Sequence, residues 1–71
     1  MRFNIGEQVE LPREHINTLG NNIGRGVIFD AIDTSQTYQT EGIGFEYGRY
    51  QLRIDEVGEE GCRCTVLERL R

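Results

Sequence analysis

The sequence lacks most of the residue types from which catalytic and metal-binding sites are built. In 71 residues it has no lysine, one histidine (His15) and two cysteines, Cys62 and Cys64. A zinc site needs about four ligands, and His15 is far along the chain from the cysteines, so we predict no metal. A Cys–His nucleophile would lack a third, orienting group. Many pairs can be drawn among the twelve acidic residues, but none is distinguished by its neighbours. We therefore expect no enzyme activity and no cofactor.

Long apolar runs are also absent. No stretch approaches the roughly 20 apolar residues that span a bilayer, and no basic segment leads into an apolar run after Met1. We expect no membrane association and a cytoplasmic protein. The length predicts one small β-barrel domain over residues 1–71, and at this size folding buries only about 60% of the surface of the unfolded chain. Such a small core often depends on an oligomer, so self-association or a protein partner is expected.

Positive charge is scarce. Eight arginines face twelve acidic residues, which gives a formal net charge of −4. A protein that binds nucleic acid by neutralising phosphates is normally basic. The overall charge therefore disfavours nucleic acid as a partner, although a local row of arginines is compatible with it.

Residues 49–70 contain the clearest pattern, two alternating strands joined by an acidic turn bracketed by glycines. Apolar positions face each other when Ile54 pairs with Cys64 and Leu52 pairs with Val66. This register leaves residues 57–61 as the loop and sets Asp55 opposite Arg63. The two cysteines then lie on the buried face, where we expect them to be reduced because their spacing is at the strained end for a disulfide.

The outward face of the same hairpin is rich in arginine. Guanidinium groups in a row can bind carboxylates or phosphates of a partner in bidentate fashion, whereas charged side chains on an open sheet face also serve simply to keep it soluble. The candidate binding surface consists of Arg49, Arg53, Arg63 and Arg69.

The rest of the chain predicts further strands. Phe3, Ile5, Val9 and Leu11 share one face of a first strand, with a bend or bulge at Gly6. Residues 12–22 form a long loop in which a helical turn over Arg13–Ile16 is compatible with Pro12.

A two-faced strand covers residues 23–33. Its Ile28 and Ile32 need cover that a small monomeric barrel does not supply, and Gly24 and Gly26 allow it to coil. Residues 34–41 are polar and are expected to form an exposed loop or hairpin tip. Ile43, Phe45 and Tyr47 then share a face, and Gly48 marks either a bulge within one bent strand or a tight turn between two.

The order and spacing of F-N-I-G-E-Q-V, G-R-G-V and the closing V-L-E-R-L resemble small SH3-like β-barrels, in particular KOW-type modules. The opening segment and the closing V-L-E-R-L also resemble type II dihydrofolate reductases, which are tetramers of such barrels. Those reductases carry a valine-glutamine-isoleucine-tyrosine run near the final strand, where this chain reads C-R-C-T-V, so the resemblance implies no reductase activity. The fold class it implies is all-β, an SH3-like barrel or a strongly bent antiparallel sheet of about five strands with a short helical turn.

Two functions remain open from the sequence. One is a non-catalytic interaction module that acts through protein–protein contacts or as a homo-oligomer, through a sheet edge or the two-faced strand. The alternative is a nucleic-acid-binding module that uses the arginine row.

Overall fold

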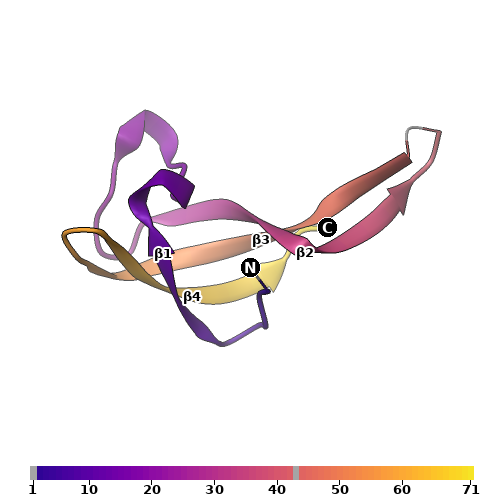
Figure 1. The fold of residues 1–71 in the computed structure, drawn as a ribbon. Helices are drawn as coiled ribbons and strands as arrows, with labels where there is room; N and C mark the ends of the chain where they lie inside the picture. The colour runs from indigo at the N-terminus through magenta and orange to yellow at the C-terminus, as the bar shows by residue number, and fades with distance from the viewer. Residues whose placement is uncertain (1, 43) are drawn as a thin grey trace.

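The computed structural model describes residues 2–42 and 44–71 and contains a single antiparallel sheet that curls into a half-barrel (Figure 1). Its strands lie in the order β1-β4-β3-β2. The bounds of the elements are β1 Gln8–Pro12, η1 Arg13–His15, η2 Leu19–Asn21, β2 Ile28–Thr40, β3 Gly44–Val57 and β4 Gly61–Arg69. The all-β class, the strong bend and the short helical turn after Pro12 are confirmed.

The described part of the chain has four strands because β3 runs without a break through Gly48. The irregularity lies in β2. Asp33 pairs with Gly48 and Thr37 pairs with the adjacent Tyr47, so residues 34–36 of β2 have no partner in the ladder with β3. Residues 34–41 were predicted to form an exposed loop or hairpin tip. They are largely exposed and lead into a hairpin, but the loop was wrong, since Thr34–Thr40 belong to β2 and the turn begins only at Glu41. Beyond this bulge β2 and β3 continue as a two-stranded ribbon that projects from the rest of the molecule (Figure 1). Ile43, which was predicted to share a face with Phe45 and Tyr47, lies outside the described residues.

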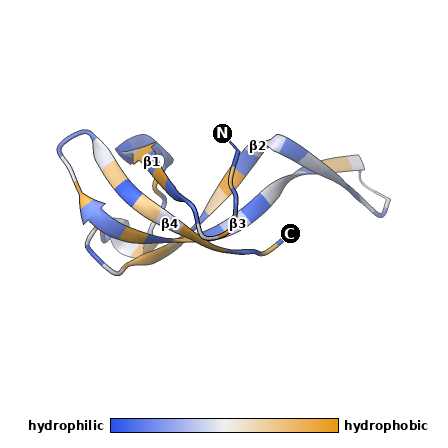
Figure 2. Ribbon diagram, turned by 90° about the horizontal axis from the view of Figure 1, so that it is seen from below, coloured by the Kyte–Doolittle hydropathy of each residue, from blue (hydrophilic) through white to orange (hydrophobic). Residues whose placement is uncertain are grey.

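The core lies on the concave face of the sheet. Apolar and polar residues alternate along the strands, so that the apolar ones face the core (Figure 2). The predicted pairs Ile54 with Cys64 and Leu52 with Val66 are both present, and all four side chains are fully buried or nearly so. The buried apolar residues are Phe3, Leu11, Ile16, Phe29, Ala31, Tyr50, Leu52, Ile54, Cys62, Cys64 and Val66.

Two glycine turns replace predicted strand segments. Gly6 has a φ of +85°, and the turn it forms leaves Ile5 exposed instead of on the buried face with Phe3. Gly26 has a φ of +87°, so residues 24–27 form a turn and the two-faced strand begins only at Ile28. Both positions use the left-handed conformation that glycine adopts without steric cost.

Within residues 2–42 and 44–71, none of the helical segments has the length and apolar character of a membrane span.

Candidate interaction surface

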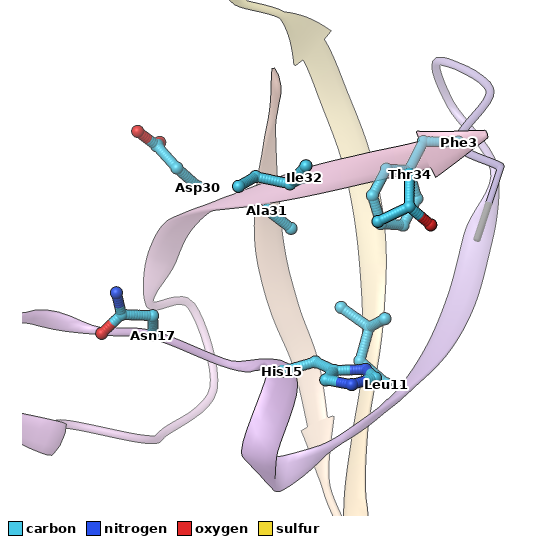
Figure 3. Close-up of a pocket in the computed structure, with 8 residues that line it drawn as sticks. All are labelled: Phe3, Leu11, His15, Asn17, Asp30, Ala31, Ile32 and Thr34. Atoms are coloured by element: carbon cyan, nitrogen blue, oxygen red, sulfur yellow. The ribbon is translucent and has the colours of Figure 1, made fainter. Parts of the chain in front are cut away.

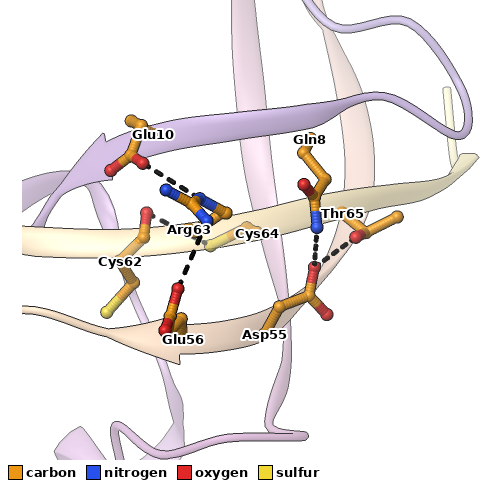
Figure 4. A network of polar contacts seen from close by, with 8 residues as sticks. All are labelled: Gln8, Glu10, Asp55, Glu56, Cys62, Arg63, Cys64 and Thr65. Carbon is orange, nitrogen blue, oxygen red and sulfur yellow. Dashed lines mark hydrogen bonds and ion pairs between the residues drawn. The ribbon is translucent and has the colours of Figure 1, made fainter.

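Arg53 and Arg63, two of the four arginines of the predicted binding surface, are engaged with carboxylates of their own chain. Arg53 Nε lies 2.9 Å from Asp55 Oδ1. Arg63 bridges two strands, with Nε 3.2 Å from Glu10 Oε1 and Nη1 3.3 Å from Glu56 Oε2 (Figure 4). These pairs are partly exposed and screened by solvent, so each contributes little to the stability of the fold. The positive charges of Arg53 and Arg63 are nevertheless neutralised by these neighbouring carboxylates.

The sheet register separates the other two arginines. Arg49 pairs with Ile32 and lies on the convex face. Arg69 pairs with Tyr50 on the opposite face, because Leu67 is an extra residue that reverses the alternation of β4. The guanidinium carbon of Arg69 lies 6.0 Å from the centre of the Tyr50 ring, and its Nε donates to the backbone oxygen of Arg71 at 2.9 Å. The four arginines therefore do not form one continuous row.

The predicted pair of Asp55 with Arg63 was wrong. Asp55 is an extra residue in β3 between the pairs Ile54 with Cys64 and Glu56 with Arg63. This bulge moves Glu56 into the position opposite Arg63. Asp55 instead accepts hydrogen bonds from Arg53, Thr65 and Gln8.

Asp55 is the centre of a polar network on the convex face that joins β1, β3 and β4 (Figure 4). The hydroxyl of Thr65 and the guanidinium of Arg53 hold the pKa of its carboxyl below the usual 3.8, and the amide of Gln8 adds to the effect. Because every partner stabilises the charged form, Asp55 is a structural carboxylate and not a proton donor at neutral pH.

The two cysteines lie in the core of the fold. Cys62 and Cys64 are free, and both are buried. Burial, with the nearby Cys62, Asp55 and Glu10, raises the pKa of the Cys64 thiol to about 12. No group of metal-ligating side chains is present in the part of the chain that the structure describes.

Exposed apolar side chains lie at intervals along the convex face of β2 and β3. Ile28 and Ile32 are about half exposed, at 53% and 51%, while Phe45 reaches 72% and Tyr47 reaches 53%. The pairing of Ile32 with Arg49 puts all four on the same face, because odd-numbered residues of β3 share it. We call this set, Ile28, Ile32, Phe45 and Tyr47, the convex patch. A cavity of about 320 Å³ adjoins it and is lined by Ile32, Tyr38, Phe45, Glu46, Tyr47 and Arg49.

A second cavity follows the free edge of β2. It has a volume of about 310 Å³ and lies between β2, the N-terminal segment and the loop after β1. Figure 3 shows Leu11 and His15 facing Ala31 across this space. Phe3, Leu11 and Ala31 supply an apolar lining, and His15, Asn17, Asp30 and Thr34 supply polar groups. We call it the edge cavity.

Ile28 and Ile32 were predicted to be left uncovered by the fold, and both are exposed. The exposure of Phe45 and Tyr47 on the same face was not predicted. Reading residues 44–57 as one strand would have placed both on the face opposite Tyr50. Comparisons of the chain with models of protein families, with curated proteins and with solved structures find no match.

Proposed function

We propose that this protein is a small non-catalytic interaction module that associates with itself through the convex patch. The observation that carries the proposal is the exposure of Ile28, Ile32, Phe45 and Tyr47 on one face of a sheet whose core lies on the other. Apolar patches of this kind mark contact sites between proteins. The small core of a 71-residue chain adds to the benefit of burying them.

Two arrangements on this face favour contact with another protein over simple solvation. Phe45 and Tyr47 are aromatic, and aromatic side chains are enriched in the centres of interfaces. Arg49 lies beside Ile32 with no described ion pair of its own, so it is available to a carboxylate at the rim of a contact.

Sedimentation velocity from micromolar to millimolar concentration tests the proposal. We expect the mass of the wild type to rise with concentration, and the double variant Phe45→Thr/Tyr47→Thr to stay monomeric. Threonine suits a strand, so the substitution removes apolar area without opposing the fold. The matched control is Leu19→Thr, because Leu19 is 98% exposed but lies outside the patch. A wild type that is only monomeric at millimolar concentration would contradict self-association.

Nucleic-acid binding through Arg49, Arg53, Arg63 and Arg69 is the weaker proposal. The net charge of −4 opposes it, and Arg53 and Arg63 already bind carboxylates. It predicts an affinity for RNA or DNA that falls steeply with salt and is reduced by Arg53→Ala with Arg63→Ala.

We also infer that the curled sheet is related to SH3-like barrels. The segments F-N-I-G-E-Q-V, G-R-G-V and V-L-E-R-L support this, together with the antiparallel pairing of β1 with the last strand around the meander β2-β3-β4.

A further inference from the structure

We infer that the free edge of β2 binds an extended segment of another protein that carries a lysine or arginine between apolar residues. This inference rests on the proposed role as an interaction module. It concerns the free edge of β2, which shares Ile28 and Ile32 with the convex patch but does not involve Phe45 or Tyr47. The segment would extend the sheet by one strand, with Asp30 selecting its basic residue and the edge cavity accepting one of its apolar side chains.

The backbone of β2 presents unpaired groups at this edge. Ile54 N donates to Val27 O at 2.8 Å, so the C=O group of Val27 points toward β3. Because the N–H and C=O groups of successive residues alternate in direction along an antiparallel strand, those of Phe29 and Ala31 point toward β3 as well. The backbone of Arg49 gives the same answer. Its N–H and C=O are hydrogen-bonded to residues 70 and 71, so they point away from β2 and form no hydrogen bond with its partner Ile32. Ile28, Asp30 and Ile32 therefore point their N–H and C=O groups away from β3. None of the described backbone hydrogen bonds outside the ladders reaches these three residues.

The side chains of the same three residues define what an added strand would carry. Residues that face each other in an antiparallel pair share a face of the sheet, so the partner's side chains would lie beside Ile28, Asp30 and Ile32. Among the described residues, Asp30 has no ion pair, and it lies between two half-exposed isoleucines. A basic residue between two apolar ones matches this order, and the net charge of −4 attracts such a segment from a distance.

The edge cavity defines the side chain on the inner face. The partner residue opposite Ala31 would point toward the concave side, where Phe3, Leu11 and Ala31 line about 310 Å³ (Figure 3). This volume is at the lower end of the range for ligand pockets and is sufficient for one aliphatic side chain. The full pattern opposite residues 32 to 28 is then apolar, apolar, basic, apolar, apolar.

A second copy of the chain fits this edge less well. When two β2 strands pair about a two-fold axis so that Ile28 meets Ile32 of the other copy, Asp30 meets Asp30. Like charges directly opposite each other destabilise a strand pair. A charged residue in the middle of an edge strand is also a common protection against pairing between identical edges. The edge therefore favours a partner of different charge.

The test uses two synthetic peptides with blocked ends and Gly-Ser flanks, one with the core Ile-Val-Lys-Val-Ile and one with Ile-Val-Glu-Val-Ile. Titration followed by NMR should shift the amide signals of Ile28, Asp30 and Ile32 with the lysine peptide. The glutamate peptide should bind at least about fivefold more weakly, because it places like charges opposite each other. The variant Asp30→Lys should reverse this preference, and Phe45→Thr/Tyr47→Thr should bind the lysine peptide like the wild type.

Equal binding of the two peptides, or shifts confined to residues away from β2, would overturn the inference. So would edge-dependent dimers that Asp30→Asn strengthens, because the occupant would then be a second copy. If neither peptide binds while the wild type still self-associates through Phe45 and Tyr47, the inference about the edge is wrong and the proposed function stands. If the peptide preference is seen in a protein that stays monomeric, self-association is wrong and the edge site stands.

Discussion

The carboxylate of Asp33 accepts the backbone N–H of Phe3, thirty residues earlier in the chain, at 2.8 Å. The same carboxylate accepts the backbone N–H and the hydroxyl of Ser35 at 2.9 and 2.6 Å. Asp33 is fully buried. It thus holds the N-terminal segment, which carries the buried ring of Phe3, against the bulge in β2.

The first prediction is that Asp33→Asn lowers the free energy of unfolding by about 2 kcal/mol, because an amide cannot serve all three donors of a buried carboxylate. Urea unfolding followed by circular dichroism measures the loss. The matched control is Asp30→Asn, an exposed change three residues earlier that should alter stability by no more than about 0.5 kcal/mol. Equal effects of the two substitutions would show that the contact with Phe3 does not stabilise the fold.

The pH dependence of this difference has a defined sign. Burial raises the pKa of Asp33, but the hydrogen bonds from Ser35 and from the backbone of Phe3 outweigh it, and the net pKa lies below the usual 3.8. A lowered pKa in the folded state stabilises the protein above pH 3.8, and the contribution disappears as pH falls through the folded value. The gap between wild type and Asp33→Asn should therefore be full at neutral pH and shrink only below about pH 3.8.

The inner face of the sheet could be predicted from the sequence because burial follows alternation. Leu52, Ile54, Cys64 and Val66 repeat with the period of a strand, and only one register brings them together. The helical turn after Pro12 could also be predicted from the sequence, because proline is favoured at the start of a helix.

The outer face could not be predicted in the same way because bulges reverse the alternation. Asp55 and Leu67 each add one residue to a strand, and neither position is marked by a glycine. Their effect is to exchange the partner of Arg63 and to move Arg69 beside Tyr50. The contact between Asp33 and Phe3 was inaccessible for another reason, since a side chain that binds a distant backbone group leaves no periodic signal. Residues 34–40 did carry a signal in their threonines and tyrosine, which favour strands.

The second prediction concerns Thr65, whose hydroxyl donates to Asp55. Replacing it by valine keeps the shape of the side chain and removes this donor, so Thr65→Val should raise the pKa of Asp55 toward its usual 3.8. Carboxyl carbon NMR during an acid titration measures the pKa directly. Asp33 is the internal control, because it binds neither Thr65 nor Asp55 and should titrate as in the wild type. An unchanged pKa of Asp55 would mean that Arg53 and Gln8 determine its charge.

The third prediction is that Cys62 and Cys64 do not react with a thiol reagent in the folded protein at pH 8. Both side chains are buried, and the pKa of Cys64 is raised to about 12. Since the thiolate is the reactive form, both cysteines should be labelled only after the protein unfolds. Unfolding in guanidinium chloride should make both thiols react. As a positive control, Glu68→Cys puts a thiol on an exposed position of β4 and should react at once. Fast labelling of the native wild type would show that β4 separates readily from its neighbours.

The fourth prediction concerns Gly61, where β1 and β4 approach each other too closely for a side chain. Gly61 pairs with Pro12 at the end of β1. A Cβ at this position would overlap the carbonyl oxygen of Leu11 and lie 3.0 Å from its carbonyl carbon and 3.1 Å from Cα of Pro12. These are backbone atoms within a ladder, so they cannot move aside without breaking the pairing of β1 with β4.

Gly61→Ala should therefore lower the free energy of unfolding by about 2 kcal/mol or more, as for overpacking in a core. The control is Gly24→Ala, since a Cβ there meets nothing closer than Cγ2 of Val27 at 3.9 Å and Gly24 has no positive φ. That change should be neutral or stabilise by up to about 1 kcal/mol through the unfolded state. Urea midpoints of the two variants decide the matter, because an unaltered midpoint for Gly61→Ala would require β1 to lie farther from β4 than the register places it.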